Sequence, residues 1–238
     1  MREIDDDKLG LLLKQTGGMV AASFNCAITV LGDRLGLYRA LGEVGPSTSS
    51  ELASHLQLHE RWVREWLHQQ TCIGQLEYDG DHGKFAISPE AYAVLADEDH
   101  PAYLMGGFDS ALAVFPAVSK LEESFRTGIG MSYDEHGPNC ACGIERMGAF
   151  TKKHRLVGEM IPQLPGMHDR LVDGAMVADV GCGGGLATIT LAQAYPATTF
   201  VGYDTSDVAL ERARANLAEA GLEHVRFCNP FQEPLPRD

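Results

Sequence analysis

The sequence lacks an excess of basic residues, and this limits the partners it can have. Its 19 Lys and Arg stand against 33 Asp and Glu, which gives a formal net charge of −14 at pH 7. Phosphate backbones and anionic membranes both attract positive surface, so we expect neither as the main partner.

Long hydrophobic runs are also missing. The longest mostly apolar stretch, residues 19–31, is shorter than the about 20 residues that span a bilayer. The N-terminus has no basic segment leading into an apolar core, as a secretory signal would. We therefore expect a cytoplasmic protein that does not bind membranes.

No cysteine pattern typical of a metal site is present. Among six cysteines, Cys140 and Cys142 form the only close pair. A zinc site would need a second pair of ligands, and none has suitable spacing. We predict reduced thiols and no metal site.

The pattern of the first hundred residues is typical of a winged helix-turn-helix. Residues 7–41 are expected to be helical. A Thr-Ser-Ser-Glu capping box at 48–51 begins a short helix, a second helix follows over 60–71, and alternation over 75–87 indicates a β-hairpin. Residues 1–100 hold eight Lys and Arg against sixteen Asp and Glu, which disfavours DNA binding.

Residues 101–170 form a second region, a helical linker or lid. We expect helices interrupted at Gly106-Gly107 and at Pro116, and then a long surface loop over Gly128–Gly143 of the kind that often covers a binding site. A further helix is expected from about 144 to 161.

The third region, residues 171–238, alternates strands and helices. Short apolar runs at 175–180, 199–203 and 224–228 indicate buried parallel strands. Helical segments over 186–194 and 208–220 separate them. This β-α-β-α-β order predicts an α/β fold, half of a doubly wound parallel sheet.

The first strand of this region ends in a glycine loop, Gly181-Cys-Gly-Gly-Gly185, and Asp204 follows the second strand. Glycines let a ligand lie on backbone amides at a helix N-terminus, and an acid at this distance can accept both hydroxyls of a ribose. A dinucleotide fingerprint, Gly-x-Gly-x-x-Gly, would place Leu186 at its third glycine position, where a small residue is needed. The other frame places Asp179 two residues before the first glycine.

That second frame, Asp179-x-Gly181-x-Gly183-x-Gly185, resembles the first motif of the S-adenosylmethionine (SAM) dependent methyltransferases with a Rossmann-like fold. The resemblance implies that the loop holds the amino-acid end of SAM, that Asp179 orients the loop and the ammonium group, and that Asp204 binds the ribose. It further implies adenine contacts from Tyr203, Thr205 and Asn229. The implied cofactor-binding set is Asp179, Gly181, Cys182, Gly183, Gly185, Tyr203, Asp204, Thr205 and Asn229.

Segments 31–38, 48–53 and 60–67 resemble the winged-helix-like dimerisation region of one subgroup of these methyltransferases. That resemblance implies a homodimer formed through the N-terminal region and a small-molecule methyl acceptor. The fold it implies has seven strands, of which this sequence holds three. We therefore expect a truncated catalytic domain with an unpaired apolar edge along Met176–Val180.

Three functions remain open from the residues alone. The first is a small-molecule methyltransferase, the second a SAM-binding regulator or truncated isoform without turnover, and the third a nicotinamide enzyme, which Leu186 disfavours. No catalytic residue is assigned, because His136 and His154 are more simply explained as surface or packing residues.

Overall fold

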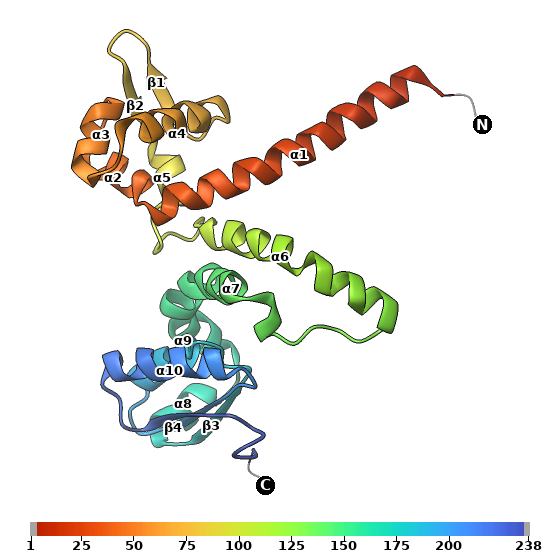
Figure 1. Ribbon diagram of the computed structural model, residues 1–238. Coiled ribbons are helices and arrows are strands. Elements are labelled where there is room, and N and C mark those ends of the chain that lie inside the picture. The colour runs from red at the N-terminus through yellow and green to blue at the C-terminus, as the bar shows by residue number, and fades with distance from the viewer. Residues whose placement is uncertain (1–3, 236–238) are drawn as a thin grey trace. The chain divides into compact units, whose positions relative to one another are not determined.

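The structure, a computed structural model, describes residues 4–235 and divides into two units. The first unit extends to Asp97 and includes Ala102–Leu112, and the second comprises Glu98–Pro101 and the chain from Ala113 onward. Helices dominate the first unit, and the second contains a small sheet (Figure 1). Within the described residues, no helix has both the length and the apolar character needed to cross a membrane.

A long helix begins the first unit. α1 (Asp6–Arg34) follows the N-cap Asp5, whose side chain accepts a hydrogen bond from a first-turn amide. The sequence predicted one helix over 7–41, but Gly36 takes φ of 71° and a separate helix, α2 (Leu37–Val44), follows it. Glycine adopts this left-handed conformation without the steric cost of a Cβ atom, so the chain turns there.

The next elements have the predicted winged helix-turn-helix order. They are α3 (Ser49–Leu56), α4 (Glu60–Cys72), β1 (Glu77–Asp79), β2 (Lys84–Ala86) and α5 (Pro89–Leu95). The capping box at the start of α3 is present, with Thr48 and Glu51 each hydrogen-bonded to the other's backbone. β1 and β2 pair in antiparallel orientation, which confirms the predicted hairpin.

The core of the first unit joins α1 to the winged helix. Trp66 of α4 donates a hydrogen bond from Nε1 to the carbonyl of Ile28 in α1, at 3.1 Å, and packs edge-on against Tyr38. The Tyr38 hydroxyl donates to the buried amide oxygen of Gln70 at 2.5 Å. Because a buried polar group without a partner is costly, this bond allows Gln70 to lie inside an apolar core.

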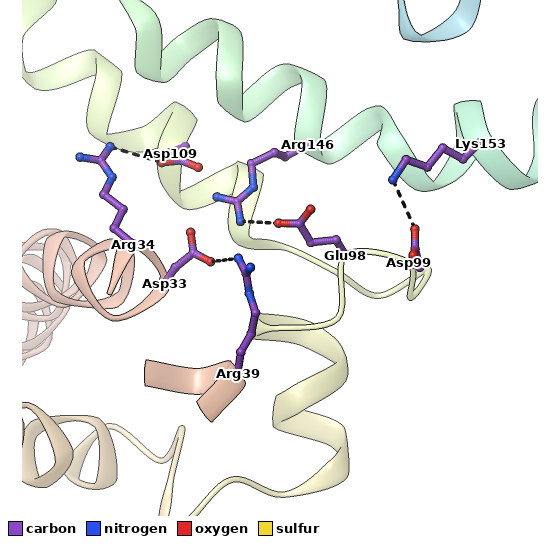
Figure 2. A network of polar contacts seen from close by, with 8 residues as sticks. All are labelled: Asp33, Arg34, Arg39, Glu98, Asp99, Asp109, Arg146 and Lys153. Atoms are coloured by element: carbon purple, nitrogen blue, oxygen red, sulfur yellow. Dashed lines mark hydrogen bonds and ion pairs between the residues drawn. The ribbon is translucent and has the colours of Figure 1, made fainter. Parts of the chain in front are cut away.

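Two ion pairs hold the C-terminal end of α1 within the first unit (Figure 2). Arg34 lies 3.7 Å from the carboxylate of Asp109, and Arg39 lies 3.5 Å from that of Asp33. Both carboxylates are buried, and a buried charge needs a partner of opposite sign. These pairs therefore restrict how α1 can rotate against its neighbours.

The helical segment that follows differs from the prediction. α6 (Met105–Thr127) includes Gly106-Gly107 in its first turn and continues through Pro116, so both expected breaks were wrong. The loop expected over Gly128–Gly143 is shorter, because α7 (Pro138–Phe150) begins inside it. Proline fits the first turn of a helix, where its missing N–H is not needed, so Pro138 begins a helix here.

Short helical segments lie on both sides of α7. η1 (Asp134–His136) precedes it, and the π-helical η2 (Thr151–Met160), η3 (Ile161–Gln163) and α8 (Met167–Asp173) lead from it to the sheet. Within the second unit, Arg146 pairs with Glu98 at 3.2 Å and Lys153 with Asp99 at 3.4 Å (Figure 2). These pairs hold the segment at 98–101 against the helices.

Three parallel strands form the sheet of the second unit, in the order β3-β4-β5. They are β3 (Met176–Val180), β4 (Thr199–Tyr203) and β5 (Val225–Cys228), connected by α9 (Leu186–Ala194) and α10 (Asp207–Ala220). Phe200 and Phe227 belong to one buried cluster with residues of both helices, as expected when right-handed crossovers place both helices on one face. The predicted half of a doubly wound sheet is confirmed.

The edge of β3 is unpaired within the described residues, as the sequence predicted. Met176 and Val180 are 74% and 69% exposed. Alternate residues of a strand point to the same face, so these two side chains lie together on the face that α9 and α10 leave uncovered. This edge is therefore open to pairing with a further strand.

Gly202 of β4 allows a test of this packing. A Cβ at this position would meet the ring of Phe227 and, at 2.9 Å, the sulfur of Cys182. Since overpacking a core costs about 1–3 kcal/mol, Gly202→Ala should lower the free energy of unfolding by about that amount in a urea titration. At the exposed control Gly158, a Cβ meets nothing within 4 Å. Equal effects of the two substitutions would contradict this packing.

Candidate functional site

The glycine loop joins the end of β3 to the start of α9. Gly181, Gly183 and Gly185 have φ of 80°, 55° and 76°, a region in which other residues are strained. The amides of Gly181 and Cys182 both donate to the carbonyl oxygen of Tyr203, at 2.7 and 3.0 Å. The turn of the loop is therefore fixed to the last residue of β4.

Asp204, directly after β4, binds the same loop. Its Oδ2 accepts a hydrogen bond from the amide of Gly183 at 2.8 Å, and its Oδ1 accepts one from the amide of Ser206 at 2.9 Å. A carboxylate has about four lone-pair positions, so each oxygen can accept a second bond. Asp204 lines a pocket and can offer this remaining capacity to a ligand.

Asp179 has a different role in this structure. Its Oδ2 accepts a hydrogen bond from the hydroxyl of Thr188 at 2.6 Å, and Thr188 is fully buried in α9. Asp179 is not among the residues that line the pocket. Its carboxylate orients the helix that follows the glycine loop.

The pocket has a volume of about 520 Å³ and lies beside the glycine loop. Three segments of the second unit form its wall: the loop with the start of α9, the turn from β4 into α10, and the η1–α7 segment with the start of η2. The lining residues are Gly181–Gly184 and Leu186, then Asp204–Ser206, Val208, Ala209 and Arg212, and finally Tyr133, Asp134, Gly137, Pro138, Ala141, Ile144, Glu145 and Lys152. Its volume falls within the about 300–1,000 Å³ usual for small-molecule sites.

Two polar contacts join the η1–α7 wall to α10. The hydroxyl of Ser206, the N-cap of α10, donates to the carboxylate of Asp134 while accepting from the amide of Ala209 at 3.0 Å. Farther along, Nε of Arg212 lies 3.0 Å from Oε2 of Glu145. These contacts hold two walls of the pocket at a fixed separation.

More acidic than basic side chains line the pocket. Its charged residues are Asp134, Glu145, Asp204, Lys152 and Arg212. Burial raises the pKa of Tyr133 above its ordinary value, and the nearby anionic groups, including all three of these carboxylates, raise it further. Such a site favours a ligand that carries positive charge.

Of the nine residues that the sequence assigned to the cofactor, five line this pocket, namely Gly181, Cys182, Gly183, Asp204 and Thr205. Tyr203 does not, because its ring is buried against Val201 and Cys228. Asn229 is also absent from the wall. Its side chain donates to Asp207 at 2.9 Å and accepts from the amide of Phe231 at 3.0 Å. The assignment of these two residues to the adenine stays a prediction.

The sequence predicted a loop over 128–143 that could cover a binding site, but it assigned no site residue within 133–152. Tyr133, Glu145 and Lys152 precede the glycine loop by some thirty residues or more, and no motif marks them. The one available signal was the composition of that predicted loop, which contains Tyr133. His136 and His154 do not line the pocket, and His154 lies 3.3 Å from the carboxylate of Asp99.

Two family models match separate parts of the chain. A model described as an Rv2258c-like winged HTH domain matches residues 23–97, and a model of a methyltransferase domain matches residues 171–236. The second match includes the glycine loop and Asp204. A comparison with curated proteins finds no match.

Solved methyltransferase structures share the fold. The mitomycin 7-O-methyltransferase MmcR aligns with a TM-score of 0.67 at 19% identity, over 98% of this chain and 70% of that one. A structure from Nostoc punctiforme described as a putative O-methyltransferase aligns with a TM-score of 0.64 at 20% identity, over 91% of this chain and 64% of that one. Human N-acetylserotonin methyltransferase in complex with SAM aligns at 0.60 and 14% identity, over 99% and 70%. The chain thus spans about two thirds of the length of these structures.

Cysteine reactivity tests the geometry of the loop. Burial, followed by the charges of Asp179 and Asp204, raises the pKa of Cys182 to about 12. Because the thiolate is the reactive form, iodoacetamide at about pH 8 should modify the exposed Cys72 and leave Cys182 unmodified, as peptide mass spectrometry would report. The thiol of Cys182 releases its proton at a lower pH in the unfolded chain than in the folded chain. The free energy of unfolding should therefore fall as pH rises from about 9 toward 12. Equal alkylation of both thiols in the folded chain would contradict this placement.

Proposed function

We propose that this chain is a SAM-dependent methyltransferase with an N-terminal winged helix-turn-helix domain, and that it binds SAM in the pocket beside the glycine loop and transfers its methyl group to a small-molecule acceptor. The observation that carries the proposal is the convergence of the glycine loop and the Asp204 carboxylate on one pocket wall.

The residues of the pocket fit this cofactor. SAM carries a sulfonium, an ammonium and a carboxylate, and the excess of acidic side chains suits its net positive charge. α9 has Gly185 as its N-cap and no side-chain cap, so its first amides can donate hydrogen bonds to the carboxylate of the amino-acid end. The spare acceptor positions of Asp204 suit the two ribose hydroxyls.

In this proposal the loop residues Gly181, Cys182, Gly183 and Gly185 hold the amino-acid end of the cofactor. Asp204 binds the ribose, and Thr205, which lines the pocket, lies beside the adenine. Asp179 acts through its bond to Thr188 as a positioning residue for the loop and α9. The adenine contacts of Tyr203 and Asn229 require these side chains to leave their present partners.

Bound SAM supplies an electrophilic methyl group on a sulfonium. Transfer is an in-line displacement, so the contribution of the chain is to bring donor and acceptor together in one orientation. The contacts between the η1–α7 wall and α10 support this, because they hold two walls of the pocket together. No lining histidine is placed to take a proton, so we assign no general base.

A small-molecule acceptor agrees with the apolar part of the pocket wall, where Pro138, Ala141, Ile144 and Val208 lie. Apolar walls with few polar groups are usual for small-molecule sites. Two similar structures are named for enzymes of small molecules, mitomycin and N-acetylserotonin.

A regulator that reads DNA through the winged helix has less support. On α4, Arg64 lies 3.7 Å from Glu60, and Arg61 stacks on the ring of Trp62. Recognition helices bring unneutralised basic and amide groups to DNA, whereas here one arginine is paired and the unit as a whole is acidic. We infer a packing role for this domain.

The exposed stripe of α1 supports a homodimer formed through the N-terminal region. Leu9, Leu13, Val20, Phe24 and Leu31 recur at helical spacing, and all five are exposed. The opposite side of the helix is buried in the first unit, through Cys26, Thr29, Val30 and Asp33. A contiguous apolar surface of this kind marks an interaction site, and a second copy offers the same stripe.

The six cysteines, all among the described residues, form no disulfide, which agrees with a cytoplasmic location.

Replacing Asp204 tests the cofactor site. Asp204→Ala removes the acceptors for the ribose and the bond to the loop, so the affinity for S-adenosylhomocysteine (SAH) in isothermal titration should fall at least about tenfold. The control is Glu219→Ala, an exposed acid on α10 outside the pocket. Unchanged affinity of the Asp204 variant would contradict the proposed site.

Charge placed on the α1 stripe tests the dimer. Leu13→Glu with Phe24→Glu should convert a dimer to a monomer in light scattering after size exclusion, because the dimer would bury four new charges, two from each copy. Leu11→Glu is the matched control, since Leu11 is also exposed but lies on another side of the helix. A monomeric unmodified chain, or dissociation by the control alone, would contradict the proposal.

A further inference from the structure

Glu145 lies over the glycine loop. It belongs to α7, and its Oε2 is so close to Gly184 that a Cβ atom added to that glycine would meet it. Gly184 also lines the pocket, as Glu145 does. A carboxylate from a helix far away in the sequence is thus placed directly on the loop that is proposed to hold the amino-acid end of SAM.

Arg212 fixes this carboxylate in place. Its Nε is 3.0 Å from Oε2 of Glu145, and the two side chains are 45% and 21% exposed. The pair uses one oxygen of the carboxylate and one nitrogen of the guanidinium, so each group keeps hydrogen-bonding capacity toward the pocket. Asn216, one turn along α10, donates to the carbonyl of Gly184 at 2.8 Å. α10 therefore positions both the loop and the acid that lies on it.

Asp179 does not occupy this place. The resemblance to methyltransferases assigned the ammonium group to Asp179, but its carboxylate is bound to Thr188 and stays outside the pocket wall. Of the three carboxylates that line the pocket, Asp204 is held between two amides and Asp134 accepts the hydroxyl of Ser206. Glu145 is the one that lies against Gly184.

We infer that Glu145 binds the ammonium group of the cofactor's amino-acid end, with Arg212 as a positioning residue that holds the carboxylate over the loop. This inference rests on the proposed function. An ammonium has three donors and no acceptor, and a charge-assisted bond to a carboxylate is about twice as strong as a neutral one. The amides at the start of α9 and the guanidinium of Arg212 would be available to the cofactor's carboxylate, so both charges of the zwitterion would have an opposite partner.

The other explanation of the pair is a structural one, in which Glu145 and Arg212 only tie α7 to α10. The two explanations differ in which ligands should bind less tightly when Glu145 is replaced. A structural tie affects every ligand of the pocket alike. An ammonium contact affects only ligands that carry the amino-acid end.

Two ligands separate these explanations. SAH carries the ammonium and carboxylate, and 5′-methylthioadenosine has the same adenosine and sulfur but no amino-acid end. In isothermal titration of the full chain, Glu145→Gln should weaken SAH binding about tenfold or more and leave the affinity for 5′-methylthioadenosine unchanged. Glutamine keeps the size and one acceptor of the side chain, and thermal unfolding by circular dichroism confirms that the variant is folded.

Glu211→Gln is the matched control, because Glu211 is an exposed acid next to Arg212 on α10 that does not line the pocket. It should leave both affinities unchanged. Equal losses for both ligands in Glu145→Gln, or no loss for SAH, would overturn the inference while leaving the proposed function intact. If the unmodified chain binds neither ligand, the proposed function fails, and this inference fails with it.

Discussion

The candidate site depends on the attachment of one loop to the end of the neighbouring strand. Three consecutive amides, those of Gly181, Cys182 and Gly183, donate to the carbonyl of Tyr203 and the carboxylate of Asp204. Because β3 and β4 are parallel and in register, their carboxyl ends meet, and the loop cannot move without breaking these bonds. The loop and the acid are therefore placed relative to each other before any ligand arrives, which reduces the ordering cost of binding.

The second constraint comes from residues far away in the sequence. The η1–α7 wall contacts α10 through Asp134 and Glu145, and it adds two of the three carboxylates that line the pocket. Without this wall the glycine loop would lie on an open surface. With it, the site has the concave shape and the excess of negative charge that suit a cationic cofactor.

Local patterns predicted the parts of the fold that local interactions determine. The helix over 186–194 and the strand over 199–203 lie within the predicted bounds, because apolar runs between a glycine turn and an acid leave few alternatives. The breaks expected at Gly106-Gly107 and at Pro116 were wrong, and the loop expected over 128–143 is shorter, because a single proline or a glycine-rich composition does not outweigh the packing of flanking turns. The pairing of Glu145 with Arg212 joins positions 67 residues apart, and only the fold brings them together.

Hydrogen–deuterium exchange with and without SAH tests the central claim most directly, since it reports which backbone amides a ligand protects. The account predicts slower exchange in peptides that cover residues 181–188 and 204–209, with no change over the hairpin of the winged helix. Protection confined to other segments, or none at saturating SAH, would contradict it.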